Sequence, residues 1–211
     1  MSINSNTQVL ELYFSPTSPY ARKCRIILLE KGLQEQVKLT VAIPSDNPPE
    51  LVEANPLGTV PALRLSPDEV LCESPVICEF LDSLSSSRLF YPIEQSARFQ
   101  ALALAALADG IMDASVTCVL ESRRPKEKYY SEWVARKENA ILRTLKSLEK
   151  HNLSDDYPWQ IGSMSLAVAL EFLNFRLNHL QWQDEHPALA QWLAVVSRKP
   201  SMRETAPLNS V

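Results

Sequence analysis

Sequence patterns typical of β-strands occur only up to about residue 84 of this 211-residue chain. Short runs of branched and aromatic residues alternate there with segments of helical periodicity, as an α/β domain requires. Past Pro92 no strand pattern returns, and apolar residues recur at three- and four-residue spacing instead. The chain is therefore predicted to contain an α/β domain followed by an all-helical domain.

The first domain is predicted to have the element order βαβαββα. A first strand is expected over residues 9–14, followed by a helix that ends near Gly32, a residue suited to a left-handed C-cap. Residues 37–43 predict a second strand. The runs 60–65 and 70–72 flank a Ser-Pro-Asp-Glu turn, which indicates an antiparallel hairpin and hence a mixed sheet. The two remaining helices are expected over 50–54 and 74–84.

A polar, serine-rich connector over residues 83–88 separates the two parts and carries no periodic apolar signal. We therefore expect an α/β domain at 1–84, a linker at 85–93 and an all-helical domain at 94–211. Within the helical domain, helical spacing predicts helices over 94–121, 126–150, 165–180 and 188–197.

Charge and hydropathy patterning exclude several classes of partner. The formal net charge is −4, with no long run of one sign, which argues against a nucleic-acid partner. No apolar run approaches the roughly 20 residues of a membrane span, and the polar start lacks the features of a signal peptide. We therefore expect no membrane association and a cytoplasmic location.

Cysteine and histidine usage gives no indication of a metal site. The four cysteines stand singly, without a CxxC pair, and only three histidines are present to join them. The sequence therefore predicts free, mostly buried thiols and no bound metal.

The segment SPTSPY, residues 15–20, stands where the first strand gives way to a helix. Ser18 followed by Pro19 pairs an N-cap hydroxyl with the residue best tolerated at the first helical position. The simplest interpretation is a capped helix start, which is worth about 1 kcal/mol. The same geometry presents free N–H groups and a partial positive charge, which suit an anion such as a thiolate.

This turn resembles the redox turn of thioredoxins and glutaredoxins, but Ser18 and Ala21 stand where those proteins carry cysteines. The segment is similar to that of the cytosolic glutathione S-transferases, in particular bacterial members that begin with an SPTSPF-like motif. The resemblance implies a thioredoxin-like domain joined to a helical one, with glutathione as co-substrate and no metal. It further implies that Ser18 is the catalytic residue, donating to the glutathione thiolate, with Thr17 as the reserve donor.

Two further segments carry the same resemblance. The loop NPLGTVP, residues 55–61, is similar to the family loop in which a cis proline, here Pro61, follows a residue whose backbone pairs with glutathione, here Val60. Glu73 and Ser74 resemble the family pair that holds the α-ammonium and α-carboxylate of the γ-glutamyl group. Taken singly, the first segment reads as an ordinary turn with a trans proline and the second as a helix capped by Ser74.

The helical half offers weaker indications. Asp109 and Asp113 share one helix face, which reads either as a solvated stripe or, by resemblance, as part of a second-substrate cleft together with Tyr20 and Arg123. Arg123 suits the negative end of a helix dipole equally well. Ser165 is expected to cap the third helix of this half, although valine replaces the acid of the family's capping box.

Together these features predict an enzyme that binds glutathione and activates its thiol for attack on a small, apolar electrophile. By resemblance it forms a homodimer. Glutathione-dependent peroxide reduction and isomerisation start from the same thiolate, so they remain open. A non-catalytic binding or interaction module of the same fold is the alternative from a different class.

Overall fold

The structure is a computed structural model that describes residues 10–86, 89–151 and 153–207. Its contacts divide the chain into two units, residues 1–89 with 205–211, and residues 90–204. The division falls within the predicted linker, and the described residues from Thr205 onward belong with the first unit. The predicted boundaries at 84 and 94 stay a prediction.

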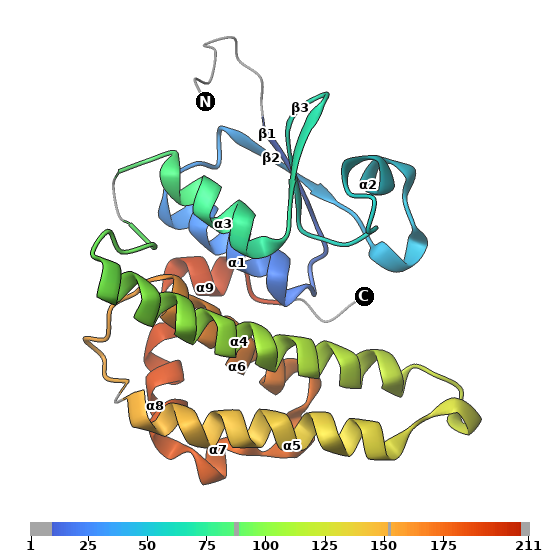
Figure 1. Cartoon of the computed structure of the whole chain (residues 1–211), viewed down its shortest axis with the longest axis vertical. Coiled ribbons are helices and arrows are strands. Elements are labelled where there is room, and N and C mark those ends of the chain that lie inside the picture. Colours follow the sequence, from blue (N-terminus) through green and yellow to red (C-terminus); the bar gives the residue numbers. More distant parts are fainter. Residues whose placement is uncertain (1–9, 87–88, 152, 208–211) are drawn as a thin grey trace. The chain divides into compact units, whose positions relative to one another are not determined.

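The first unit has the predicted element order and a four-stranded mixed sheet (Figure 1). The strand order is β2-β1-β3-β4, in which β1 and β2 run parallel and the other neighbours antiparallel. Val9 lies outside the described residues. The elements are β1 (Leu10–Phe14), α1 (Pro19–Glu30), β2 (Val37–Val41), a 3-10 turn (Pro44–Asp46), α2 (Pro49–Ala54), β3 (Ala62–Ser66), β4 (Glu69–Cys72) and α3 (Ser74–Ser83).

Strand alternation gives this sheet two buried faces. Tyr13 and Ala62 pack with Leu51 and Ala54 of α2 on one face. Leu12, one residue from Tyr13, points to the opposite face, where α1 and α3 lie side by side (Figure 1). Both faces are therefore covered by helices.

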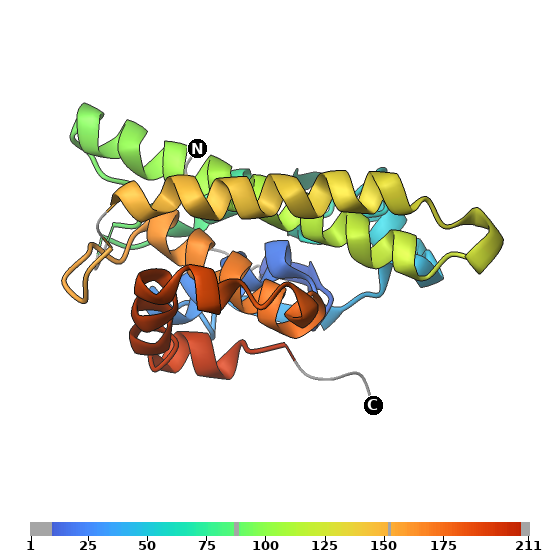
Figure 2. The same ribbon diagram turned by 90° about the horizontal axis from the view of Figure 1, so that it is seen from below.

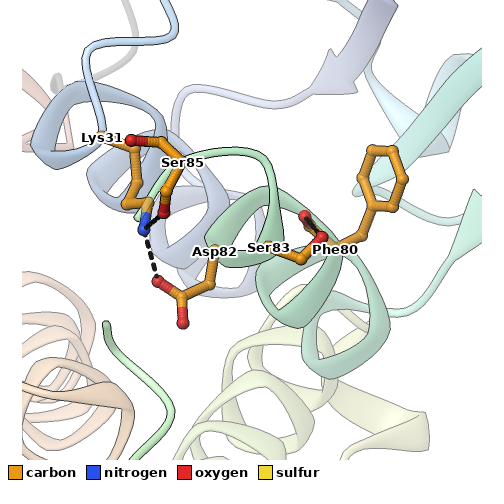
Figure 3. A network of polar contacts seen from close by, with 5 residues as sticks. All are labelled: Lys31, Phe80, Asp82, Ser83 and Ser85. Carbon is orange, nitrogen blue, oxygen red and sulfur yellow. Dashed lines mark hydrogen bonds and ion pairs between the residues drawn. The ribbon is translucent and has the colours of Figure 1, made fainter. Parts of the chain in front are cut away.

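Two charged residues, Arg22 on α1 and Lys31 at the C-cap of that helix, lie inside the first unit and not on its surface. Arg22 and Lys31 are both almost fully enclosed. The Lys31 ammonium lies 3.0 Å from the carboxylate of Asp82 on α3 and also donates to the carbonyl oxygen of Ser85 (Figure 3). Periodicity alone did not reveal this contact, because Asp82 lies 51 residues further along the chain.

The second unit is helical throughout its regular elements, as predicted. The long helix α4 packs against α5 and α6, and α4 and α5 run antiparallel (Figures 1 and 2). The α-helices are α4 (Gln95–Ser122), α5 (Ser131–Leu148), α6 (Ile161–Arg176), α7 (Trp182–Glu185), α8 (Pro187–Val196) and α9 (Pro200–Glu204), with short 3-10 turns at Lys126–Lys128, Glu149–His151 and Asn178–Leu180.

Helix α4 is the one helix of the described chain that is long and apolar enough to cross a membrane on those two criteria. The criteria do not distinguish a membrane span from the core helix of a globular protein. Here one side of α4 is buried against other helices, including Leu104, Ala108 and Met112, so its length and composition are weak evidence for a span.

The start of α6 corrects the expectation for Ser165. The helix begins one turn earlier, at Ile161, because Gln160 and Ser163 form a reciprocal capping box that the sequence pattern did not suggest. The backbone N–H of Gln160 donates to Ser163 Oγ at 3.0 Å. A Cβ on Gly162 would lie 2.6 Å from the carbonyl oxygen of Ala101, so glycine permits the close approach of α6 to α4.

Ser165 is therefore buried inside the helix, and its hydroxyl has no hydrogen-bond partner. We expect Ser165→Ala to raise the free energy of unfolding by up to about 1 kcal/mol, because it removes an unsatisfied buried group and alanine favours helix. Urea denaturation measures the change. Ser163→Ala is the matched control and should lower stability by about 1 kcal/mol through loss of the cap. Equal losses of stability in the two variants would contradict the assignment of the cap to Ser163 and not to Ser165.

Candidate functional site

The three segments singled out in the first unit meet at one end of the strands, which is called the sheet edge below. Tyr13 on β1 pairs with Ala62 on β3, and Ala62 pairs with Cys72 on β4. Because β3 runs antiparallel to both neighbours, this row joins the end of β1, the start of β3 and the end of β4. The chain leaves or enters the sheet at this row through residues 15–18, 60–61 and 73–74.

Ser18 occupies the N-cap of α1, as predicted from its sequence. Its backbone is extended, and its Oγ accepts a hydrogen bond from the Ala21 N–H at 3.2 Å. The Ser18 carbonyl accepts from the Arg22 N–H at 3.1 Å, which closes the first turn. A hydroxyl that accepts through its oxygen keeps its own hydrogen for donation, so Ser18 combines capping with a donor at a positive helix end.

Thr17 stands beside Ser18, and its hydroxyl contacts a residue that the sequence analysis did not single out. The Thr17 Oγ1 lies 3.4 Å from the Oγ of buried Ser15. The only signal in the sequence was the density of hydroxyls in the segment. The three hydroxyls of the turn thus divide into a Ser15–Thr17 pair and the cap of Ser18.

The Val60–Pro61 peptide bond is cis, which confirms that expectation, and both residues are buried. The loop before them is tied by Asn55. The Asn55 side chain donates to the Thr59 carbonyl at 2.9 Å and accepts from the Leu57 N–H at 3.1 Å. The loop therefore delivers Val60 to the sheet edge in a defined conformation.

The structure corrects the expected cap of α3. Ser74 is not the N-cap but the first helical residue, and the cap is Glu73. The reason is the Glu73 backbone, whose φ of 70° turns the chain so sharply that Ser74 is already helical. Ser74 is 2% exposed, whereas Glu73 is open to solvent. A non-glycine residue held at positive φ is typical of functional sites.

Tyr13, on the strand before the turn, carries a further hydroxyl, but this group bonds to a different partner. Its OH donates to the Glu11 carboxylate at 3.1 Å, and burial, followed by the Glu11 charge, raises the pKa of Tyr13. Hydrogen bonds from Lys38 and Thr40 in turn lower the pKa of Glu11. Tyr13 is therefore unsuited to activate a thiol at this edge.

The residues assigned to a second-substrate cleft fall in both units. Tyr20 is half-buried on α1 of the first unit. In the second unit Asp109 is half-buried and Asp113 exposed on α4, and Arg123 is the C-cap of that helix. Their assignment to one cleft stays a prediction. Among the residues that the structure describes, no group of three or more His, Cys, Asp or Glu side chains is placed to hold a metal.

Comparison with known proteins gives several matches. Residues 17–84 match the family model of the glutathione S-transferase N-terminal domain. A glutathione transferase family member from Pseudomonas fluorescens Pf-5, solved with bound glutathione, is 39% identical, with a TM-score of 0.90 and coverage of 95% of this chain and 100% of that chain. A glutathione S-transferase from Methylobacillus flagellatus KT, solved with glutathione bound, is 31% identical, with a TM-score of 0.86 and coverage of 94% and 100%.

A curated relative extends the same similarity. The uncharacterized GST-like protein YibF of Escherichia coli K12 is 29% identical over 201 residues, covering 94% of this chain and 98% of its own. Identities of 39% and 31% over the full length of the two solved relatives go well beyond a shared fold. The chain belongs to the glutathione S-transferase family.

Proposed function

We propose that this protein is a glutathione transferase that binds glutathione at the sheet edge of the first unit and activates its thiol for attack on a small, apolar electrophile. The observation that carries the proposal is the row Tyr13–Ala62–Cys72, which brings the three candidate segments together. The relatives solved with bound glutathione support the choice of ligand.

In this proposal each segment takes one part of glutathione. The Ser18 hydroxyl, at the N-terminus of α1, donates to the thiolate. A free thiol has a pKa of about 8.5, and lowering it by one unit requires about 1.4 kcal/mol of preferential thiolate stabilisation, which a hydroxyl donor and a helix terminus together supply. The backbone of Val60 pairs with the cysteinyl part, Ser74 receives the γ-glutamyl carboxylate and Glu73 faces its ammonium.

The proposal includes a homodimer, which the family resemblance favours, and a cytoplasmic location, which the sequence pattern favours. It also retains Tyr20, Asp109, Asp113 and Arg123 as residues of the electrophile site. Light scattering at micromolar concentration measures the mass of the particle, and a monomer would contradict the dimer.

Calorimetric titration with glutathione, followed by conjugation assays with an aryl halide and further electrophiles, tests the function. Binding together with conjugation is the expected result. Binding without turnover of any electrophile would support the non-catalytic module instead. Absence of binding would contradict the proposed site altogether.

Ser74→Ala should raise the KM for glutathione by about tenfold with little change in kcat, because it removes a hydroxyl bonded to a non-reacting carboxylate. Steady-state kinetics with varied glutathione measures the change. Ser83→Ala is the matched control on the same helix. The Ser83 hydroxyl donates to the Phe80 carbonyl at the other end of α3 (Figure 3), so its loss should leave KM unchanged. An unaltered KM in Ser74→Ala would refute the carboxylate role.

A further inference from the structure

Near the end of the described chain, Thr205 contacts α1, the helix that begins at the candidate site. Its hydroxyl oxygen accepts a hydrogen bond from Arg22 Nε at 3.3 Å, and its carbonyl oxygen accepts from Arg25 Nη1 at 3.5 Å. Thr205 is 1% exposed and Arg22 is 3% exposed, so the contact between these two side chains is shielded from water. Although residues 90–204 form the second unit, Thr205 belongs with the first.

The two arginines reach the two flanks of the turn that carries Ser18. On the helix side, the backbone N–H of Arg22, the residue whose side chain bonds Thr205, donates to the Ser18 carbonyl at 3.1 Å. On the strand side, the Arg25 guanidinium lies over the ring of Phe14, 4.8 Å from its centroid, and Phe14 is the last residue of β1. Thr205 therefore connects, through one arginine on each side, to both ends of the turn.

The electrostatics of this cluster favour acceptors between the guanidinium groups. Burial and, to a smaller extent, the charge of Arg22 lower the pKa of Arg25. Arg22 is buried and Arg25 half-buried, so these neighbouring cations need oxygen atoms directed at them, and hydrogen bonds to charged donors are stronger than those between neutral groups. Thr205 supplies one such oxygen to each arginine.

We propose that Thr205 is a positioning residue, which acts through Arg22 and Arg25 to hold the first turn of α1, and with it the Ser18 hydroxyl, in the orientation that serves the thiolate. This inference rests on the proposed function where it concerns the thiol. Its structural half, the order of the first turn, stands independently.

The test replaces Thr205 by valine, which keeps the shape and removes the hydroxyl acceptor. We expect kcat/KM to fall by about three- to tenfold at neutral pH, with KM for glutathione unchanged within about twofold, because the lost hydrogen bond affects the thiolate and not the peptide. The pKa of the bound thiol, followed by thiolate ultraviolet absorbance against pH, should rise toward its free value. Thr205→Ser should restore both quantities.

Thr144→Val is the matched control, since the Thr144 hydroxyl donates to its own helix at the Ala140 carbonyl. The proposal would be overturned if Thr205→Val lowered the Tm but left the pKa of the bound thiol and kcat/KM at their native values. The contact would then be purely structural. Full activity in Thr205→Val with lost activity in Thr205→Ser would overturn it as well.

Hydrogen exchange separates this inference from the proposed function. The amides of Ala21 and Arg22, which both donate to Ser18, should exchange faster in Thr205→Val than in the native protein or in Thr144→Val. Native protein that does not bind glutathione would contradict the proposed function, and faster exchange would still support the positioning role. Unchanged exchange at these two amides would overturn that role whatever the activity.

Discussion

Replacing Ser18 by alanine is expected to lower kcat/KM for conjugation by about 10- to 100-fold, while the affinity for glutathione stays within a few fold. The hydroxyl donates to a charged thiolate, and such hydrogen bonds are worth about 1.5–3 kcal/mol. The remainder of glutathione is held elsewhere, so binding is largely preserved. Steady-state kinetics across neutral pH and calorimetric titration measure the two quantities.

The same substitution removes the cap of α1, because Ser18 Oγ accepts from the Ala21 N–H. Ser18→Gly separates the two effects, since glycine at an N-cap costs only a few tenths of a kcal/mol but supplies no donor. Both variants should therefore lose activity. Thr17→Val should retain it. Activity kept in both Ser18 variants and lost in Thr17→Val would transfer the catalytic role to Thr17.

Asp82→Ala should lower the free energy of unfolding by about 3–5 kcal/mol, because it removes the carboxylate that faces a buried ammonium. The Lys31 side chain is 0% exposed and the Asp82 side chain 5% exposed, and the two charged atoms are 3.0 Å apart. Water therefore has little access to the cation after the substitution. Urea unfolding followed by circular dichroism measures the loss.

Two comparisons make this prediction specific. In the pair Arg64–Glu53, the charged atoms are 3.8 Å apart and the Glu53 side chain is 73% exposed, so Glu53→Ala should cost less than about 1 kcal/mol. The double variant Lys31→Met with Asp82→Leu should recover most of the loss, because no buried charge remains. Equal losses for Asp82→Ala and Glu53→Ala would show that burial does not set the strength of the pair.

The fold was predictable because the periodicity of apolar residues, which distinguishes strands from helices, is a local property of the sequence. The change from strand to helical periodicity near residue 84 indicated an α/β part and a helical part. Gly32 follows the Lys31 C-cap of α1 in the left-handed region, with φ of 68°. The three candidate segments came from resemblance, and the strand register then brought them to one edge. The specific assignment of Ser18 as the thiolate donor stays a prediction.

Two kinds of feature were not predictable, namely contacts between residues distant in sequence and the exact starts of two helices. Arg22 and Lys31 are charged, yet both are buried, with partners 183 and 51 residues further along the chain. The cap of α3 moved from Ser74 to Glu73, because a positive φ at a glutamate has no signature in a single sequence. Ser165 failed as a cap because an additional helical turn precedes it.

The return of Thr205 to α1 sets an order of events during synthesis. Arg22 and Thr205 are 183 residues apart, and at about 5–20 residues per second the ribosome takes roughly 10–40 s to add the second after the first. Helix α1 and the whole helical unit after it are therefore synthesised before Thr205, which supplies the acceptor oxygens for the two arginines of α1. A nascent or truncated chain that stops short of Thr205 has the Ser18 turn without that support, and in our proposal full activity requires that Thr205 has been translated.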